Sequence, residues 1–150
     1  MSTDYIVASL PALAFGAPAP LTREKLAEAV PDIDAIVAES PWRDLETQLR
    51  NAVAEARGGA KYARPAEGCS LYWKKRVLDC FAEKDVLRRD EQLDRVWWDA
   101  AGELTPASAP LGKGALVTYA IRLGIALKRT KISKEQGNEA FDRLTAETKR

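Results

Sequence analysis

The 150-residue sequence contains no histidine, only two cysteines and a single methionine. The missing histidine removes the commonest general base, the commonest metal ligand and the usual partner of a nucleophilic serine or cysteine. Cys69 and Cys80 cannot form a zinc site without histidine, and we expect them to be ordinary thiols in a reducing compartment. The sequence therefore predicts a protein that is not an enzyme and that has neither a metal nor a cofactor.

The sequence also lacks an apolar run long enough to cross a membrane. The best candidate, Gly114–Ile121, is interrupted by Arg122, whereas a membrane span needs about 20 residues. The first 20 residues are largely apolar, but their only charged side chain is Asp4, and a secretory signal should begin with positive charge. We therefore expect a cytoplasmic protein with no direct membrane span.

Neither sign of charge dominates, because 23 basic and 22 acidic side chains give a formal charge of +1. A globally basic nucleic-acid coat and an acidic disordered tail are both excluded. The balance is uneven along the chain: residues 1–60 carry 5 basic and 9 acidic side chains, and residues 61–150 carry 18 and 13. This polarity would let the protein dock on a charged partner in a preferred orientation.

Helix signals recur along the chain. Thr22, Ser40 and Ser70 each precede a stretch with apolar residues at helical spacing, as N-capping residues do. From about Asp90 a further helix carries an unbroken i, i+3, i+4 apolar pattern. Sustained strand alternation, a heptad array and a fixed-period repeat are all missing. The sequence predicts an all-α fold, with residues 1–150 forming one bundle of about six helices.

The two ends of the chain give further expectations. Residues 1–21 are predicted to be extended or irregular, with Tyr5–Leu10 as a strand or extended clasp because it is rich in β-forming residues. A long helix is predicted over 113–131. Ser133 is then expected to cap a separate last helix, with Phe141 and Leu144 facing inward.

The start of that long helix, Gly112-Lys113-Gly114, invites comparison with a phosphate-binding loop. Such a loop needs glycine, four residues, and then Gly-Lys-Ser/Thr. Here Ala107 stands at the first glycine position, and Gly114 stands where the magnesium-binding Ser/Thr should be. We interpret this segment as a flexible loop that enters a helix.

Two features are candidates for contacts with a partner. Trp97 and Trp98 are adjacent, so on a helix their side chains point about 100° apart and cannot easily face one core. We expect Trp97 to lie in the core and Trp98 to be more exposed, as a partner contact. The second feature is a basic stretch made up of Lys128, Arg129, Lys131 and Lys134.

This basic stretch is expected to form a helix end and the following turn. Six basic and no acidic residues lie between Leu104 and Glu135, which favours either a solvated helix end or contact with an acidic protein surface. Nucleic acid is not an expected partner, because the stretch has no interleaved aromatic platform and no known reading motif.

The competing functional class is a small helical hydrolase that uses Asp or Glu. It would need a cleft lined by carboxylates from different helices. Asp32 and Asp34 lie close together in a turn-like stretch, and we interpret them as capping groups rather than as an acid–base pair.

Several segments resemble an uncharacterised bacterial protein family whose genes lie within V/A-type ATP synthase operons. The opening YIVASLPAL at residues 5–13 is similar to that family's N-terminus, and Leu49-Arg50-Asn51-Ala52, followed by Arg57, is similar to its Leu-Arg-Asn-Ala helix. The half of the chain from Leu93 onward resembles its C-terminal part, with Tyr119 and Leu123 at its Tyr-x-x-x-Leu pattern.

The resemblance implies a non-catalytic subunit, or an assembly or coupling factor, of a V/A-type ATP synthase. Partners would be its stalk or peripheral subunits, which would bring the protein to the membrane through the complex. The C-terminal half is also faintly similar to the C (or d) socket subunit of the rotary ATPase central stalk. This chain is less than half as long, so it could form only a shortened socket. A stand-alone helical adaptor unrelated to the ATPase is the alternative.

Overall fold

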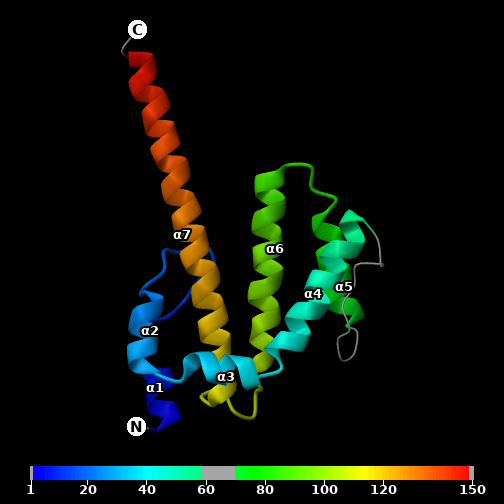
Figure 1. The fold of residues 1–150 in the computed structure, drawn as a ribbon, viewed down its shortest axis with the longest axis vertical. Coiled ribbons are helices and arrows are strands. Elements are labelled where there is room, and N and C mark those ends of the chain that lie inside the picture. The colour runs from blue at the N-terminus through cyan, green and yellow to red at the C-terminus, as the bar shows by residue number, and fades with distance from the viewer. Residues whose placement is uncertain (1, 59–69, 149–150) are drawn as a thin grey trace.

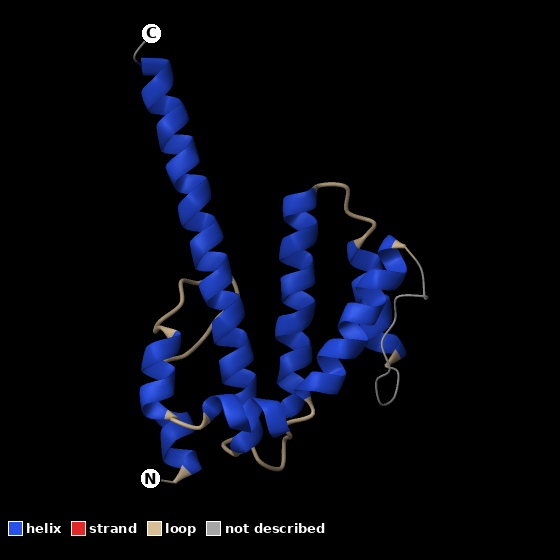
Figure 2. Ribbon diagram, in the orientation of Figure 1, coloured by secondary structure: helices blue, strands red, loops and turns tan. Residues whose placement is uncertain are grey.

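The computed structural model describes residues 2–58 and 70–148, and in these ranges it contains helices and no strand (Figure 2). This confirms the predicted all-α class, with seven α-helices described where about six were predicted. The elements are α1 (Thr3–Ser9), α2 (Arg23–Ala29), α3 (Ile33–Glu39), α4 (Trp42–Arg57), α5 (Leu71–Cys80), α6 (Val86–Ala101), the 3-10 turn η2 (Gly102–Leu104) and α7 (Lys113–Thr148).

Helix α7 is the element around which the others are arranged (Figure 1). It contacts α1 and α2 on one side and α6 on the other, and α3 crosses its lower part. Helices α4 and α5 pack on each other and on α6, on the side of α6 away from α7. The N-terminal part of α7 is thereby enclosed between the two groups of helices.

Two apolar clusters form the core, and α7 contributes to both. Leu49, Val77 and Val96 are buried in the first cluster, which joins α4, α5 and α6. Leu123 belongs to the second cluster, where α7 meets α2, α3 and the N-terminal segment, while Val117 of α7 faces the first. Each fully buried aliphatic side chain stabilises the fold by about 1.5–3 kcal/mol, before the loss of conformational entropy is subtracted. Because α7 has buried side chains in both clusters, it holds the two groups of helices together.

The predicted caps largely agree with the observed helix starts. Thr22 Oγ1 accepts a hydrogen bond from Lys25 N at 3.3 Å, and Ser70 Oγ accepts one from Trp73 N at 3.4 Å. Helix α6 begins earlier than the predicted Asp90, because Asp85 caps it and accepts a bond from Leu87 N at 2.9 Å.

Two other predicted caps behave differently. Ser40 Oγ accepts a bond from Trp42 N at 3.3 Å, although Pro41 occupies the N-cap position of α4. Asp32 occupies the N-cap position of α3, but its side chain makes no capping hydrogen bond there.

The expectation of a strand or extended clasp at Tyr5–Leu10 is wrong. This segment lies mostly within α1, whose first turn is capped by Ser2, with Tyr5 N donating to Ser2 Oγ at 3.4 Å. Ile6 and Val7 pack against the second apolar cluster. A helix satisfies its backbone groups internally, whereas a strand would need a neighbouring strand, and none is described.

The expectation of a separate last helix capped by Ser133 is also wrong. Helix α7 continues without a break for 36 residues to Thr148, and no proline lies within it to interrupt the hydrogen bonds of the helix. We call residues 133–148 the α7 extension. They extend past the N-terminal end of α6 (Figure 1). Phe141 and Leu144 on this extension are 68% and 65% exposed, and thus do not face inward as predicted. No helix in the described ranges has the length and apolar character needed to cross a membrane.

The Gly112-Lys113-Gly114 segment has a packing role at the start of α7. A Cβ added at Gly114 would collide with the carbonyl oxygen of Leu104, so glycine is needed where η2 crosses the helix. One turn later the buried Thr118 hydroxyl donates to Ala101 O at 2.7 Å and lies 2.6 Å from Thr105 Oγ1. These contacts fix the start of α7 against the end of α6.

Candidate protein-binding groove

A cavity of about 520 Å³ lies between α3, α4, α6 and α7, and we call it the α6–α7 groove. Its walls combine apolar and charged side chains. The apolar ones include Val37, Leu93, Trp97, Ile121 and Ile125, and the charged ones are Arg23, Asp34, Glu46, Arg50, Asp90, Asp94 and Lys128.

A second hollow of about 600 Å³ lies along α4 and shares two lining residues with the groove. We call it the Trp97 hollow, because Trp97 and Arg50 line both depressions. Its remaining lining residues are Val53, Ala54, Arg57 and Gly58. Trp97 is thus a partly buried aromatic side chain shared by two depressions along α4, α6 and α7, which we together call the trough.

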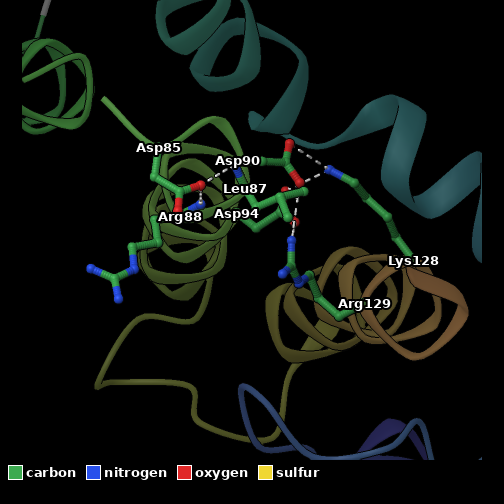
Figure 3. Close-up of polar contacts among 7 residues, drawn as sticks. All are labelled: Asp85, Leu87, Arg88, Asp90, Asp94, Lys128 and Arg129. Atoms are coloured by element: carbon green, nitrogen blue, oxygen red, sulfur yellow. Dashed lines mark hydrogen bonds and ion pairs between the residues drawn. The ribbon is translucent and has the colours of Figure 1, made fainter. Parts of the chain in front are cut away.

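A four-residue ion-pair cluster forms the α7 side of the groove (Figure 3). Lys128 Nζ lies 2.9 Å from Asp94 Oδ1 and 3.4 Å from Asp90 Oδ1. Arg129 Nη1 lies 3.0 Å from Asp90 Oδ2 and 3.1 Å from Asp94 Oδ2. Asp90 and Asp94 are four residues apart on α6 and face α7, so the cluster joins these two helices.

Asp94 is the most enclosed member of this cluster, with only 12% of its side chain exposed. Burial alone would lower the pKa of Lys128, but the hydrogen bond and negative charge of Asp94, with the charge of Asp90, outweigh it and raise that pKa. Lys128 is therefore held in its charged form at neutral pH. The cluster resembles a structural clamp more than a reactive centre.

Carboxylates from three helices line the groove, which is the arrangement that the hydrolase alternative requires. Asp34 comes from α3, Glu46 from α4, and Asp90 and Asp94 from α6. Glu46 pairs with Arg50 at 3.3 Å, and both α6 carboxylates are in the ion-pair cluster. Three of the four acids are thus engaged by cations. The described residues contain no group of His, Cys, Asp and Glu that could hold a metal ion.

The predicted exposure of Trp98 is wrong, because Trp98 is the more buried of the two tryptophans. Trp98 is only 6% exposed, whereas Trp97 is partly buried and lines the groove. Phe15 covers Trp98 with an edge-on contact at 5.6 Å between ring centroids, and the Arg122 guanidinium lies 5.2 Å above its ring. Arg122 Nε also donates to Trp98 O at 3.0 Å. Both sides of α6 are covered, so an offset of 100° does not expose either ring.

The predicted basic helix end is also wrong, because α7 continues past it. Lys128 and Arg129 are turned toward α6 and are used inside the protein. Lys131 and Lys134 are exposed, and they follow Lys128 at helical spacing on the same continuous helix. Of the five predicted partner-contact residues, only these two present an exposed charge that no described ion pair uses.

The cysteine prediction can be followed for one residue only. Cys80 is a buried free thiol whose Sγ donates to Arg76 O at 3.2 Å. Burial raises the pKa of this thiol, which disfavours the reactive thiolate. Cys69 lies outside the described residues.

Sequence reasoning missed Arg50, Arg57 and the groove-facing position of Trp97. Arg50 and Arg57 share one face of α4 with Val53 and Ala54 at helical spacing, a local signal that could have grouped them. Trp97 comes from α6, so no local pattern shows that it lies beside them. Searches of family models, of curated proteins and of solved structures returned no match for this chain.

Proposed function

We propose that this protein is a non-catalytic binding subunit, or an assembly or coupling factor, of a V/A-type ATP synthase. The observation that carries the binding role is the position of partly buried Trp97, which lines both the α6–α7 groove and the Trp97 hollow. A half-buried aromatic side chain between apolar neighbours and flanking charges is the usual centre of a protein interface. The choice of the ATP synthase as partner rests on the resemblance of the segments around Tyr5, Leu49 and Tyr119.

In this proposal the protein acts in the cytoplasm and reaches the membrane only through the complex. Stalk and peripheral subunits are its partners, and a shortened central-stalk socket is one form that the role could take. The exposed Lys131 and Lys134 lie farther along α7 than Lys128; we call these two lysines the basic edge, and they are the part of the predicted basic contact that we retain.

The test is affinity capture of the ATP synthase from a native lysate at low salt, with the captured subunits identified by mass spectrometry. Wild type should retain ATP synthase subunits. Ala54→Arg, which fills the Trp97 hollow, should lose most of them, while Ala35→Arg, the same change on an exposed face of α3, should not. Capture of no ATP synthase subunit by wild type would end the ATPase proposal.

The basic edge is tested separately with Lys131→Glu combined with Lys134→Glu. These changes leave the ion-pair cluster intact and should weaken capture most at low salt, because rim charges act mainly on association rate. If the double variant captures the complex as well as wild type does, these two lysines are not in the interface.

The carboxylate-lined groove favours one second candidate, a small hydrolase. Asp34 is the groove carboxylate for which no ion pair is described, so it is the residue to change. Turnover of ester or phosphate substrates by the pure protein, abolished in Asp34→Asn, would replace the binding proposal. No turnover by wild type would remove the hydrolase candidate.

A further inference from the structure

The Trp97 hollow also indicates the chemistry of the partner that it receives. Its floor is apolar, and among the described residues the charged ones that line it are Arg50 and Arg57. We propose that the hollow binds an acidic amphipathic helix, which places a large apolar side chain over Trp97 and carboxylates against Arg50 and Arg57. This inference rests on the proposed binding function but not on the identity of the ATP synthase.

Arg57 is prepared for such a contact. Its guanidinium carbon lies over the Phe81 ring, 5.9 Å from the ring centroid, in a cation–π contact. The N–H groups at the edge of the guanidinium group point in its plane, where they can form two parallel bonds to one carboxylate. The aromatic ring thus limits the motion of the cation before a partner arrives.

Arg50 can exchange its present partner at little cost. It pairs with Glu46 at 3.3 Å, but 69% of the arginine side chain is exposed, and exposed pairs of this kind contribute little to stability. A partner carboxylate at the centre of an interface would be less hydrated, so its bond to Arg50 would be stronger than the present one. The second cation is therefore available to the incoming helix.

Two of the four acids that line the α6–α7 groove are already paired with cations of α7 and do not oppose an acidic ligand. Asp90 and Asp94 are already neutralised by Lys128 and Arg129 at distances of 2.9–3.4 Å. The trough also consists of two depressions along helices, which suits a ligand with apolar residues at i, i+3 and i+7. A helix with an apolar stripe and acidic flanks meets both conditions.

The experiment uses two labelled 18-residue model peptides with the same leucine and phenylalanine stripe. One has glutamate on both flanks of the stripe and the other has lysine. Fluorescence anisotropy with the full chain should show at least tenfold tighter binding of the acidic peptide, and its affinity should fall as salt is raised. Equal affinity of the two peptides, or no binding of the acidic one, would overturn the proposal.

Charge reversal localises the site. The double variant Arg50→Glu with Arg57→Glu should bind the acidic peptide at least tenfold more weakly than wild type and should bind the lysine peptide more tightly. Arg43→Glu with Arg88→Glu changes the net charge equally at exposed positions outside the hollow and should leave at least half of the affinity. An equal loss in both double variants, with circular dichroism showing both folded, would mean that net charge alone attracts the peptide and would refute the site.

Two results separate this proposal from its alternatives. Peptide binding at the arginines without capture of any ATP synthase subunit would remove the ATPase proposal and leave this one standing. Self-association of wild type in sedimentation experiments, abolished by Arg50→Glu with Arg57→Glu, would assign the hollow to a second copy of the chain instead of a foreign helix.

Discussion

Replacement of Trp98 by alanine tests the revised assignment of the two tryptophans. Trp98 is 6% exposed, and a tryptophan buries up to about 250 Å² of side chain. At about 25 cal/mol/Å² this corresponds to roughly 6 kcal/mol of burial, part of which alanine keeps. The Arg122 guanidinium, 5.2 Å above the ring, would lose a contact that contributes about 0.5–2 kcal/mol. We expect Trp98→Ala to lower the free energy of unfolding by about 3–5 kcal/mol.

Trp97→Ala is the matched comparison, one residue away on the same helix. Because Trp97 is only partly buried and lines the groove, we expect it to cost about 1–2 kcal/mol. Urea unfolding followed by circular dichroism gives both values, and the dependence on urea concentration should be the same in wild type and variants. Trp98→Phe keeps a ring and should recover more than half of the loss. If Trp97→Ala costs as much as Trp98→Ala, the assignment of the α6 faces is wrong.

Further changes test the close packing, the clamp and the thiol. Gly114→Ala should lower the free energy of unfolding by more than about 2 kcal/mol in urea titrations, while Gly112→Ala, where an added Cβ meets only ordinary contacts, should be nearly neutral. Asp94→Asn should cost about 1–3 kcal/mol at pH 7. Because folding raises the pKa of Lys128, this residue contributes fully to the free energy of unfolding below its unfolded pKa of about 10.5. That contribution is lost as the pH rises through the folded pKa. Asp94→Asn should therefore lose less stability than wild type does at alkaline pH. Cys80 should be alkylated slowly in native protein and quickly in urea, as peptide mapping would show, and fast native labelling would contradict its burial.

The features that the sequence predicted correctly depend on neighbours in the chain. Thr22 and Ser70 cap helices because their hydroxyl groups reach backbone N–H groups three residues later, and this geometry needs nothing from the rest of the fold. The all-α class followed from the same local spacing. Ser133 shows the limit of capping residues as a signal. Its side chain predicts the start of a new helix, but the residue lies in the middle of α7.

The features that the sequence could not predict depend on distant segments. Trp98 is covered by Phe15, which lies more than 80 residues earlier in the irregular N-terminal segment. Lys128 and Arg129 are paired because Asp94 lies on the facing helix, and a one-dimensional pattern cannot show which helix faces which. The candidate site is of the same kind, since Trp97 and Arg57 come together only when α4 packs on α6.

The unbroken course of α7 has a mechanical consequence. A helix rises about 1.5 Å per residue, so Thr148 lies roughly 27 Å beyond Thr130, whose hydroxyl accepts a bond from Ala19 N at 3.1 Å. A tilt of about 5° at that point would move the tip by about 2 Å, on the basis of this rise per residue. Conversely, a sideways load on the tip would act through a long lever arm on the contacts of Lys128 and Arg129 with α6. A force applied near Thr148 would therefore be transmitted along α7 to the ion pairs beside the α6–α7 groove.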